Sequence, residues 1–496
     1  MKTKVFFLWL FIMIVSTTKA QQITFDLPLS KKSHRPRILA GYWHSGLNKI
    51  IVNEKLNHGI AHYLYDTSFK LIASYERLYS EEEIYRNNMP LRFAKEISLG
   101  KDYWEAYGCD TAVAVRKLDF VKGRDTTIAL AKYTSEYKNA DLLAILPQKN
   151  ACIFVCYAVR KKTARLLLYR WEAGNSTFSE SEYLIPESSL SETEQEKFNH
   201  LLEMDYKAAF QQITVSQTNQ PDVFQLPAKS QVFYNDSMIY LVNNTPYSTG
   251  INVMSVNYVS KKLRIHNYFL NELDRAELGT ATERHSIATI YDSTLIIENC
   301  SDRIFEYHFF NVVSGALLRS YKVKVSDSLT MLVHSPYRQV GTFSSASKEI
   351  ELEKEKQFIR RKNNGIQFLK PSLVGDSLVL TFGSLNGNPT LATILIAVST
   401  AALGYMANIH IGDVQFIPYL VLRQHKLVFA QSKFAINGWG ASKSSNISSI
   451  LDQLISADKL KYLSAENAIF IDLHNKLYLA VYNSNLKVFE VTKFYQ

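Results

Sequence analysis

The feature that most constrains this chain is a short signature that returns along the sequence: a polar turn, often Asp-Ser, followed directly by a run of large apolar residues. Asp236-Ser237 leads into Met-Ile-Tyr-Leu-Val, and Asp292-Ser293 leads into Thr-Leu-Ile-Ile. Successive copies are 57, 83, 49 and 50 residues apart when these positions are aligned: Met238, Leu295, Leu378, Leu427 and Leu477. Recurrence near 50 residues predicts stacked all-β units.

The rest of the chain shows the same mixture of short apolar runs and turns, for example a hairpin over 61–74 that reverses at 66–68. If Ile50, Val113 and Ile153 mark earlier copies, the chain holds about eight units of roughly 60 residues, against about 40 to 50 in a four-stranded blade. These repeats resemble those of β-propellers, although the Gly-His and Trp-Asp signature of WD repeats is absent. The resemblance implies an all-β fold, a β-propeller of six to eight blades with seven favoured.

The excess length predicts helical insertions in a single propeller-like domain over 21–496. One insertion, at about 186–213, opens with a capping box and continues as a broad apolar stripe. A second, at 347–362, is rich in Glu, Lys and Arg, so its surface is expected to be solvated. A third lies at 389–412 and contains no charged residue.

The third insertion includes an apolar run at 390–409 that is long enough to cross a bilayer. No Lys or Arg flanks it between Lys370 and Arg423, and the repeat resumes beyond it at Leu427. Three interpretations stay open: a buried helix or strand pair, an apolar lid that contacts a membrane peripherally, and a membrane span. The resumed repeat argues against the span, because a span would separate neighbouring units.

The N-terminus predicts export. Lys2 and Lys4 precede an apolar run over 5–15, and Thr18-Lys19-Ala20 offers a cleavage site, which together indicate a signal peptide over 1–20. The segment ending in Ala-Gln-Gln is similar to the signal peptides of bacterial envelope proteins. We therefore expect a periplasmic, outer-envelope or extracellular protein.

The charge and cysteine content of the chain limit the partners and disulfide bonds that can be expected. The net charge is +10 over 496 residues and the basic residues form only short, separate groups, so no nucleic-acid partner is expected. The chain has four cysteines. Cys152 and Cys156 are four apart in a strand-like segment, roughly 13 Å along one face, which is too far for a bridge. Buried thiols, or a long-range bridge such as Cys109 to Cys300, are the alternatives.

No motif predicts catalysis or a cofactor. His58 and His62 have a metal-ligand spacing, but Gly59 indicates a turn and strand, so no metal site is predicted. Glu272 and Asp274 form an acidic pair in a loop-like segment, for which a solvated loop is the simpler interpretation. The chain is therefore expected to be non-enzymatic, although single residues from different blades can meet in a propeller.

Two glycine-flanked aromatic segments are the candidate ligand-binding residues: Tyr42 and Trp43, and Trp439. An exposed indole in a projecting loop can stack on a sugar or anchor a protein, whereas the alternative is a Trp that folds back onto the sheets. The resulting hypothesis is an exported, non-enzymatic β-propeller that binds a protein or glycan at the cell envelope. The alternative is a polysaccharide hydrolase or lyase that uses carboxylates in the central channel.

Overall fold

The computed structural model describes most strands of the chain and the turns between many of them. The described residues are 22–26, 37–44, 47–56, 59–78, 93–99, 102–109, 112–132, 140–148, 150–160, 163–185, 213–218, 230–243, 250–269, 285–301, 303–325, 329–341, 348–352, 354–374, 376–386, 426–441, 468–473, 476–483 and 488–495. The chain divides into two compact units, which are Met1–Leu78 with Phe120–Gly123 and Ser448–Gln496, and Tyr79–Asp119 with Arg124–Ile447.

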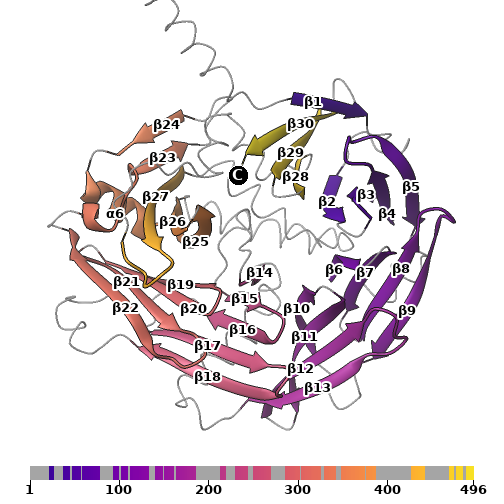
Figure 1. Cartoon of the computed structure of the whole chain (residues 1–496), viewed down its shortest axis with the longest axis horizontal. Coiled ribbons are helices and arrows are strands. Elements are labelled where there is room, and N and C mark those ends of the chain that lie inside the picture. The colour runs from indigo at the N-terminus through magenta and orange to yellow at the C-terminus, as the bar shows by residue number, and fades with distance from the viewer. Residues whose placement is uncertain are drawn as a thin grey trace, which may run out of the picture. The chain divides into compact units, whose positions relative to one another are not determined.

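The first unit holds two antiparallel four-stranded sheets within the described residues (Figure 1). One sheet runs in chain order through β2 (Arg37–His44), β3 (Lys49–Leu56), β4 (Gly59–Tyr65) and β5 (Leu71–Leu78). The other has the order β1 (Gln22–Asp26), β30 (Val488–Tyr495), β29 (Lys476–Asn483) and β28 (Ala468–Leu473). The first described strand therefore completes the sheet that the last three build.

The second unit holds five sheets within the described residues, and four of them follow chain order. Two have four antiparallel strands before residue 186: β6 (Phe93–Leu99), β7 (Asp102–Cys109), β8 (Ala112–Asp119) and β9 (Arg124–Lys132), then β10 (Asp141–Pro147), β11 (Ala151–Arg160), β12 (Thr163–Glu172) and β13 (Ser179–Leu184). Two more follow: β14 (Ile213–Gln217), β15 (Ser230–Tyr234), β16 (Met238–Asn243), β17 (Gly250–Asn257) and β18 (Lys262–Phe269), then β19 (His285–Tyr291), β20 (Thr294–Cys300), β21 (Ile304–Asn311) and β22 (Leu317–Lys324). Only the β14–β15 pair is parallel among these strands.

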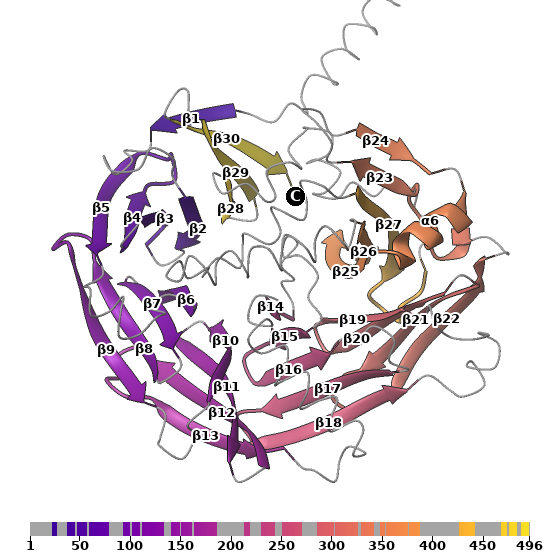
Figure 2. The ribbon, with the colours of Figure 1, turned by 180° about the vertical axis from the view of Figure 1, so that it is seen from behind.

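The fifth sheet departs from chain order and carries the helix (Figure 2). Its order is β24 (Lys348–Glu351), β23 (Arg338–Gly341), β27 (Lys426–Ala435), β26 (Ser377–Asn386) and β25 (Ile366–Val374). The α-helix α6 (Glu355–Asn363) packs against β25, β26 and β27, and a 3-10 turn, η5 (Leu329–Met331), precedes β23. In the described part of the chain α6 is the only α-helix.

The recurring polar signature forms hairpin turns. Asp292 has a φ of 52°, which is left-handed, so the chain reverses within two residues and Tyr291 pairs with Thr294. In the copy before β16, the Asn235 carboxamide oxygen accepts hydrogen bonds from the backbone N–H groups two and three residues ahead, at 3.0 and 2.9 Å. Such side-chain acceptors favour a turn over a continuing strand. The predicted hairpin over 61–74 is confirmed, with β4 and β5 joined through a turn that begins at Asp66.

One assumption behind the repeat is wrong. Leu378 lies in β26 and Leu427 in β27, and these strands are neighbours in one sheet, so the 49-residue step does not connect two units. The remaining aligned residues do lie in three different sheets, in β16, β20 and β29. The signature marks a strand that follows a tight turn, and one sheet contains it twice.

Successive sheets of the second unit pack face to face through apolar side chains. Because neighbouring residues of a strand point to opposite faces, each sheet contributes to two cores. In β20, Leu295 and Ile297 pack toward the β14–β18 sheet, whereas Ile296 and Cys300 pack toward the β23–β27 sheet and α6. The core of each pair of sheets therefore draws on alternate residues of the same strand.

The predicted all-β class is confirmed, with small antiparallel sheets, most of them four-stranded, that are consistent with propeller blades. The insertion at 186–213 lies outside the described residues except for the start of β14, and the insertion at 389–412 lies outside them entirely. The segment 347–362 is strand β24 followed by α6, so it is helical only in its second half. No helix in the described segments combines the length and apolar character of a membrane span.

Candidate functional site

Both faces of the β19–β22 sheet carry polar side chains as well as apolar ones. On β21, Glu306 and His308 point to one face, whereas Tyr307 points to the other with Phe305 and Phe309. On β20, Glu298 shares the face of Tyr307, to which it is paired across the strands. The alternation of two strands thus builds two separate polar clusters, one on each face.

The first cluster is sealed from solvent and centres on an ion pair. The Lys362 Nζ atom of α6 lies 2.5 Å from Glu298 Oε1, and both side chains are 0% exposed. Lys362 Nζ also donates a hydrogen bond to Gln367 Oε1 at 2.9 Å. Tyr307, the cross-strand register partner of Glu298, accepts a hydrogen bond from Ser432 Oγ at 3.4 Å. We call these five residues the buried ion-pair cluster.

The pKa shifts in the buried ion-pair cluster follow from the burial of its charged groups. Burial raises the pKa of the Glu298 carboxyl, and the Lys362 ammonium opposes that shift without cancelling it. Burial is the largest single influence on Lys362 and would lower its pKa, but the electrostatic and hydrogen-bond interactions with Glu298 and the electrostatic interaction with Cys300 together raise it. Burial also raises the pKa of Tyr307 well above its usual value. The cluster holds its protons tightly and joins α6 to the β19–β22 sheet.

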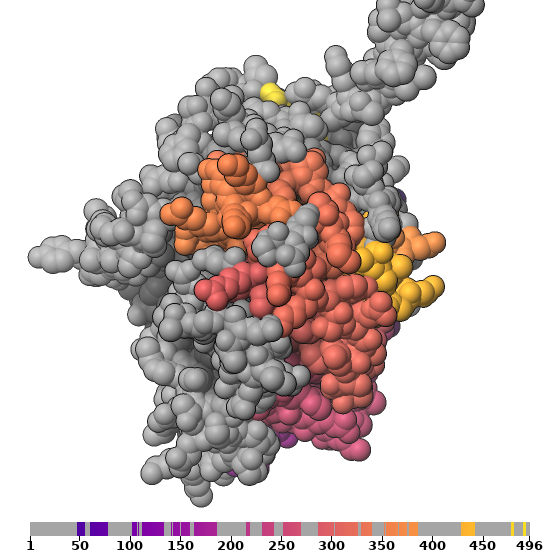
Figure 3. Space-filling model, turned by 90° about the vertical axis from the view of Figure 1, so that its left-hand side faces the viewer, coloured from indigo at the N-terminus to yellow at the C-terminus, as the bar shows by residue number. Residues whose placement is uncertain are grey.

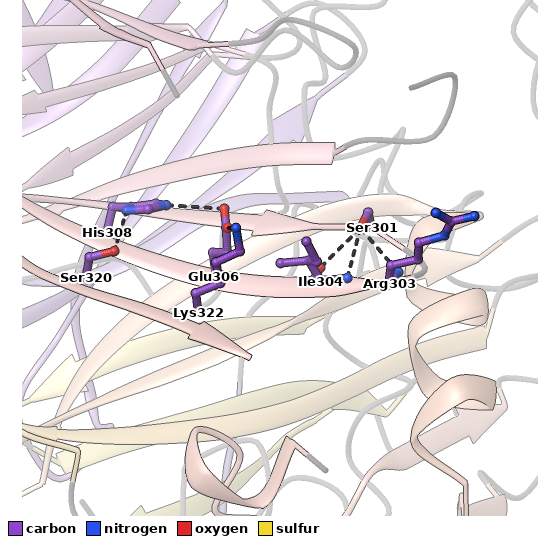
Figure 4. A network of polar contacts seen from close by, with 7 residues as sticks. All are labelled: Ser301, Arg303, Ile304, Glu306, His308, Ser320 and Lys322. Carbon is purple, nitrogen blue, oxygen red and sulfur yellow. Dashed lines mark hydrogen bonds and ion pairs between the residues drawn. The ribbon is translucent and has the colours of Figure 1, made fainter. Parts of the chain in front are cut away.

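The second cluster lies on the opposite face and includes exposed residues of β22, and Figure 4 shows its side chains. His308 Nδ1 lies 2.9 Å from Ser320 Oγ, and His308 Nε2 lies 3.4 Å from Glu306 Oε2. Lys322 Nζ is 3.7 Å from the other Glu306 oxygen. With its proton on Nε2, the imidazole donates toward Glu306 and its Nδ1 accepts the Ser320 hydroxyl hydrogen. We call these four residues the outer polar network.

A tight turn positions the strands of the outer polar network. Ser301 Oγ accepts hydrogen bonds from the backbone N–H groups of Arg303 and Ile304, at 3.3 and 3.0 Å (Figure 4). This local pattern closes the β20–β21 connection and favours a turn. It supports the β20–β21 register, in which Glu306 lies opposite Asn299.

The outer polar network differs from the buried one in its access to solvent. Ser320 is exposed and the Lys322 side chain is 36% exposed, whereas those of His308 and Glu306 are 13% and 4% exposed. A serine hydroxyl beside a covered imidazole can be approached from outside while the imidazole stays fixed. Chemically, such a cluster can bind polar groups or activate the hydroxyl.

The outer polar network ends on β22, the edge strand of its sheet. Among the described strands β22 pairs only with β21, and six of its eight residues are exposed. Leu317 and Leu318 are exposed side by side, and Arg319, Lys322 and Lys324 follow without any acidic residue. Figure 3 views the side on which β22 lies, and the salmon atoms of this part of the chain are seen at the surface.

The structure places the predicted binding residues differently from the sequence analysis. Tyr42 and Trp43 lie within strand β2 rather than in a loop, paired with Ile51 and Ile50, and their side chains lie outside the described residues. Trp439 does not project, because it is 9% exposed and stacks on Phe309 with ring centroids 5.2 Å apart. A role of these residues in ligand binding stays a prediction.

The fold of the turn explains the position of Trp439. Gly438 and Trp439 both have left-handed backbones, with φ of 81° and 57°, and Ala435 N–H donates to Gly440 O at 2.8 Å. The reversal directs the indole back onto the core. Tyr321 of β22 then donates its hydroxyl hydrogen to Trp439 O at 2.6 Å. Trp439 therefore folds back onto the sheets, which is the second of the two interpretations of its sequence.

The structure tests only some of the predictions about the cysteines, the histidine pair and the acidic pair. Cys152, Cys156 and Cys300 are buried thiols, so the long-range bridge to Cys300 is wrong, and the side chain of Cys109 lies outside the described residues. His58 and the Glu272–Asp274 pair also lie outside them. Among the residues that the structure describes, no three His, Cys, Asp or Glu side chains gather as a metal site would require.

Neither polar cluster was predicted from the sequence. A glutamate inside the apolar run of β20 was a usable signal for Glu298, since an unpaired charge is costly in a core. Lys362 gave no such signal, because it follows two arginines in a charged helix. His308 and Ser320 become partners only through the cross-strand register.

Comparison with known proteins identifies no family for the chain. No family model matches the sequence, and no curated protein matches it. Solved structures similar to it include an oligogalacturonate lyase in complex with manganese, with a TM-score of 0.33, 7% identity and coverage of 96% of this chain and 98% of that one. The Dos1 propeller is similar over 69% of this chain and 66% of its own, with a TM-score of 0.29 and 11% identity. Similarities of this size do not bear on what this chain binds or does.

Proposed function

We propose that this chain is an exported binding protein of the cell envelope, built on a β-propeller of six to eight blades, with β22 as its docking edge for a protein partner. The single observation that carries the proposal is the composition of β22. It is an edge strand with two adjacent exposed leucines and three basic residues. Exposed edges invite pairing with another strand, and natural proteins usually keep apolar residues off them.

The chemistry of the docking edge selects the partner. An added strand gains affinity from main-chain hydrogen bonds and specificity from alternate side chains. Leu317 and Leu318 offer apolar contact to it on opposite faces of the strand. Arg319 and Lys324 also lie on opposite faces, so a partner strand with acidic side chains on both faces is complementary in charge. We therefore assign an extended acidic and apolar segment as the partner.

Strand β18 provides a matched comparison within the same unit. It is also an edge strand and also presents exposed basic residues, Lys262 and Arg264. Its apolar residues, Leu263 and Ile265, are partly buried and pack on the neighbouring core. β18 thus has the charge of β22 without the exposed leucines.

A labelled peptide tests the docking edge. The probe is a fluorescent peptide that repeats Glu-Glu-Val-Val, about eight residues long to match one strand, so that both faces carry acidic and apolar side chains. A Lys-Lys-Val-Val peptide of the same length is its counterpart. We expect saturable binding of the acidic peptide, measured by anisotropy. The double change Arg319→Glu and Lys324→Glu should weaken it about tenfold or more, equivalent to about 1.4 kcal/mol.

The same charge reversal on β18, Lys262→Glu with Arg264→Glu, is the control and should change binding by less than about twofold. Equal weakening by both reversals would show that only net charge is sensed, and the docking edge would be rejected. Binding of polysaccharide fragments in place of the acidic peptide would also reject it, in favour of a glycan partner.

Export is tested separately. N-terminal sequencing of the protein from its native cells should give Gln21 as the first residue, in an envelope or extracellular fraction. A cytoplasmic protein that begins at Met1 would contradict export and leave the peptide result unaffected. A catalytic role of channel carboxylates on polysaccharide stays a prediction of the sequence analysis.

A further inference from the structure

We infer that Ser320 is a reactive serine that accepts an acyl group from an activated ester, with His308 as its general base. The inference uses the outer polar network and goes beyond the docking of a partner (Figure 4). It does not depend on the proposed docking edge, because it concerns only the Ser320 hydroxyl group and its base.

The distances fit the roles. Ser320 Oγ is 2.9 Å from His308 Nδ1, within the range of a nucleophile–base hydrogen bond. The other imidazole nitrogen, Nε2, lies 3.4 Å from Glu306 Oε2. Glu306 is therefore a positioning residue that selects the tautomer with a free lone pair on Nδ1 and stabilises the imidazolium that forms.

The burial of the three residues also fits. Ser320 is exposed on an edge strand, so an ester can reach its hydroxyl. His308 is largely covered, and its ring lies 6.3 Å from the Phe310 ring on the same strand. A base held by packing beside an accessible nucleophile loses little freedom when it reacts.

The acyl transfer balances without a further reactant. The Ser320 oxygen forms a bond to the ester carbonyl carbon, while the hydroxyl proton moves to His308 Nδ1. The bond from that carbon to the alcohol oxygen breaks, and the leaving alkoxide or phenoxide takes up the proton. The products are an ester on Ser320 and a free alcohol or phenol, with His308 neutral again.

Lys322 supplies positive charge near the developing oxyanion. It lies on the same strand face as Ser320, two residues further along, and its ammonium group is partly exposed. A cation at this place stabilises the tetrahedral intermediate more than the neutral ester.

Acetylation by p-nitrophenyl acetate tests the inference on the full-length mature protein. We expect mass spectrometry of peptides to find an acetyl group on Ser320 and absorbance to show one equivalent of p-nitrophenolate released rapidly. In His308→Gln the rate at Ser320 should fall about 100-fold or more, the contribution of a general base. Added imidazole should restore part of the rate in His308→Gly, which a purely structural role of His308 would not allow.

Three variants complete the experiment. Ser320→Ala should remove the rapid release, whereas Ser293→Ala, an exposed serine of the same sheet, should leave it unchanged. Glu306→Gln should slow acetylation less than His308→Gln, and Glu306→Asp should be closer to wild type. Thermal unfolding of each variant checks that the sheet is intact.

Two results would overturn the inference. One is acetylation confined to lysine side chains such as Lys322, with Ser320 unmodified. The other is equal acetylation of Ser320 in the wild type and in a folded His308→Gln variant, which would show that the imidazole does not act as a base.

Discussion

Two glutamate–lysine pairs lie on opposite faces of the β19–β22 sheet, and they differ mainly in burial. Glu298 and Lys362 are 2.5 Å apart and fully buried. Glu306 and Lys322 are 3.7 Å apart, and the lysine side chain is about one third exposed. The same two residue types therefore form a sealed link between a helix and a sheet in one place and a solvent-accessible network in the other.

The difference teaches that the surroundings decide what an ion pair contributes. In water the attraction between the charges is weak and competes with side-chain entropy, so an exposed pair adds about 0–1 kcal/mol. In a core, each charge has lost its hydration and depends on the other, so removal of one partner is costly. We expect the buried pair to govern stability and the exposed pair to leave its groups available for chemistry.

The largest expected effect tests this contrast directly. Lys362→Met should lower the free energy of unfolding by about 3–5 kcal/mol, because Glu298 would stay buried without a countercharge. Lys322→Met, the same change on the other face, should lower it by only about 1 kcal/mol, because Lys322 is partly exposed and the buried Glu306 keeps His308 as a neighbour at 3.4 Å. Chemical denaturation monitored by tryptophan fluorescence measures both.

The paired variant Glu298→Met with Lys362→Met is the control for lost volume. It should recover much of the stability, because apolar residues of similar size often replace a buried ion pair at little cost. Equal losses for Lys362→Met and Lys322→Met would break the comparison.

The backbone beside the buried ion-pair cluster should tolerate no added methyl group. A Cβ on Gly383 of β26 would lie 1.9 Å from the Val428 carbonyl oxygen and 2.8 Å from the Phe429 Cα. Gly383→Ala should therefore destabilise the protein by about 1–3 kcal/mol or more. Gly440→Ala, with no atom within 4 Å of the new Cβ, is the matched control and should change the melting temperature little.

The free energy of unfolding should decrease at high pH because of the buried groups. The pKa values of Lys362 and Tyr307 are raised above the ordinary 10.5 and 10.0, so the folded state keeps their protons longer than the unfolded state. The stabilisation that these two groups give the folded state is fully present below about pH 10. It is lost as the pH rises through their pKa values in the folded protein. Denaturation midpoints should therefore stay level from about pH 8 to about pH 9.5 and fall between about pH 10 and about pH 11, and Tyr307→Phe should reduce the fall. A midpoint unchanged over this range would contradict the prediction.

The smallest effect concerns reactivity rather than stability. Cys300 belongs to the same buried core as Tyr307 and is 1% exposed, so a thiol reagent should modify it only after the sheets separate. Mass mapping after brief alkylation should show Cys300 unmodified in native protein and modified in denaturant. Rapid native modification would mean that the buried face opens as readily as the outer one.

The fold was largely predictable because its signals are local. Asp-Ser turns and apolar runs report on one hairpin at a time, and hairpins such as that of Asp66 were placed correctly. The misassigned step between Leu378 and Leu427 shows the limit of such signals, since a turn signature does not tell which sheet a strand joins. Strand order depends on contacts that are distant in sequence.

The candidate site was not predictable for the same reason. Lys362 looked like part of a solvated helix, and only the packing of α6 on β25–β27 shows that it is buried. His308 and Ser320 are 12 residues apart and meet through the β21–β22 register. The sequence around Trp439 suggested an exposed side chain, but flanking glycines permit a projecting loop and a folded-back turn equally well.

The pairing of β26 with β27 makes the apolar segment between them separable from the sheet. Asn386 and Lys426 are register partners, so the ends of β26 and β27 that flank residues 387–425 lie side by side. An Asn-Gly hairpin turn can join the same two ends. Residues 387–425 can thus be replaced by a short turn. Comparison of that shortened protein with the full chain would show which properties depend on residues 390–409.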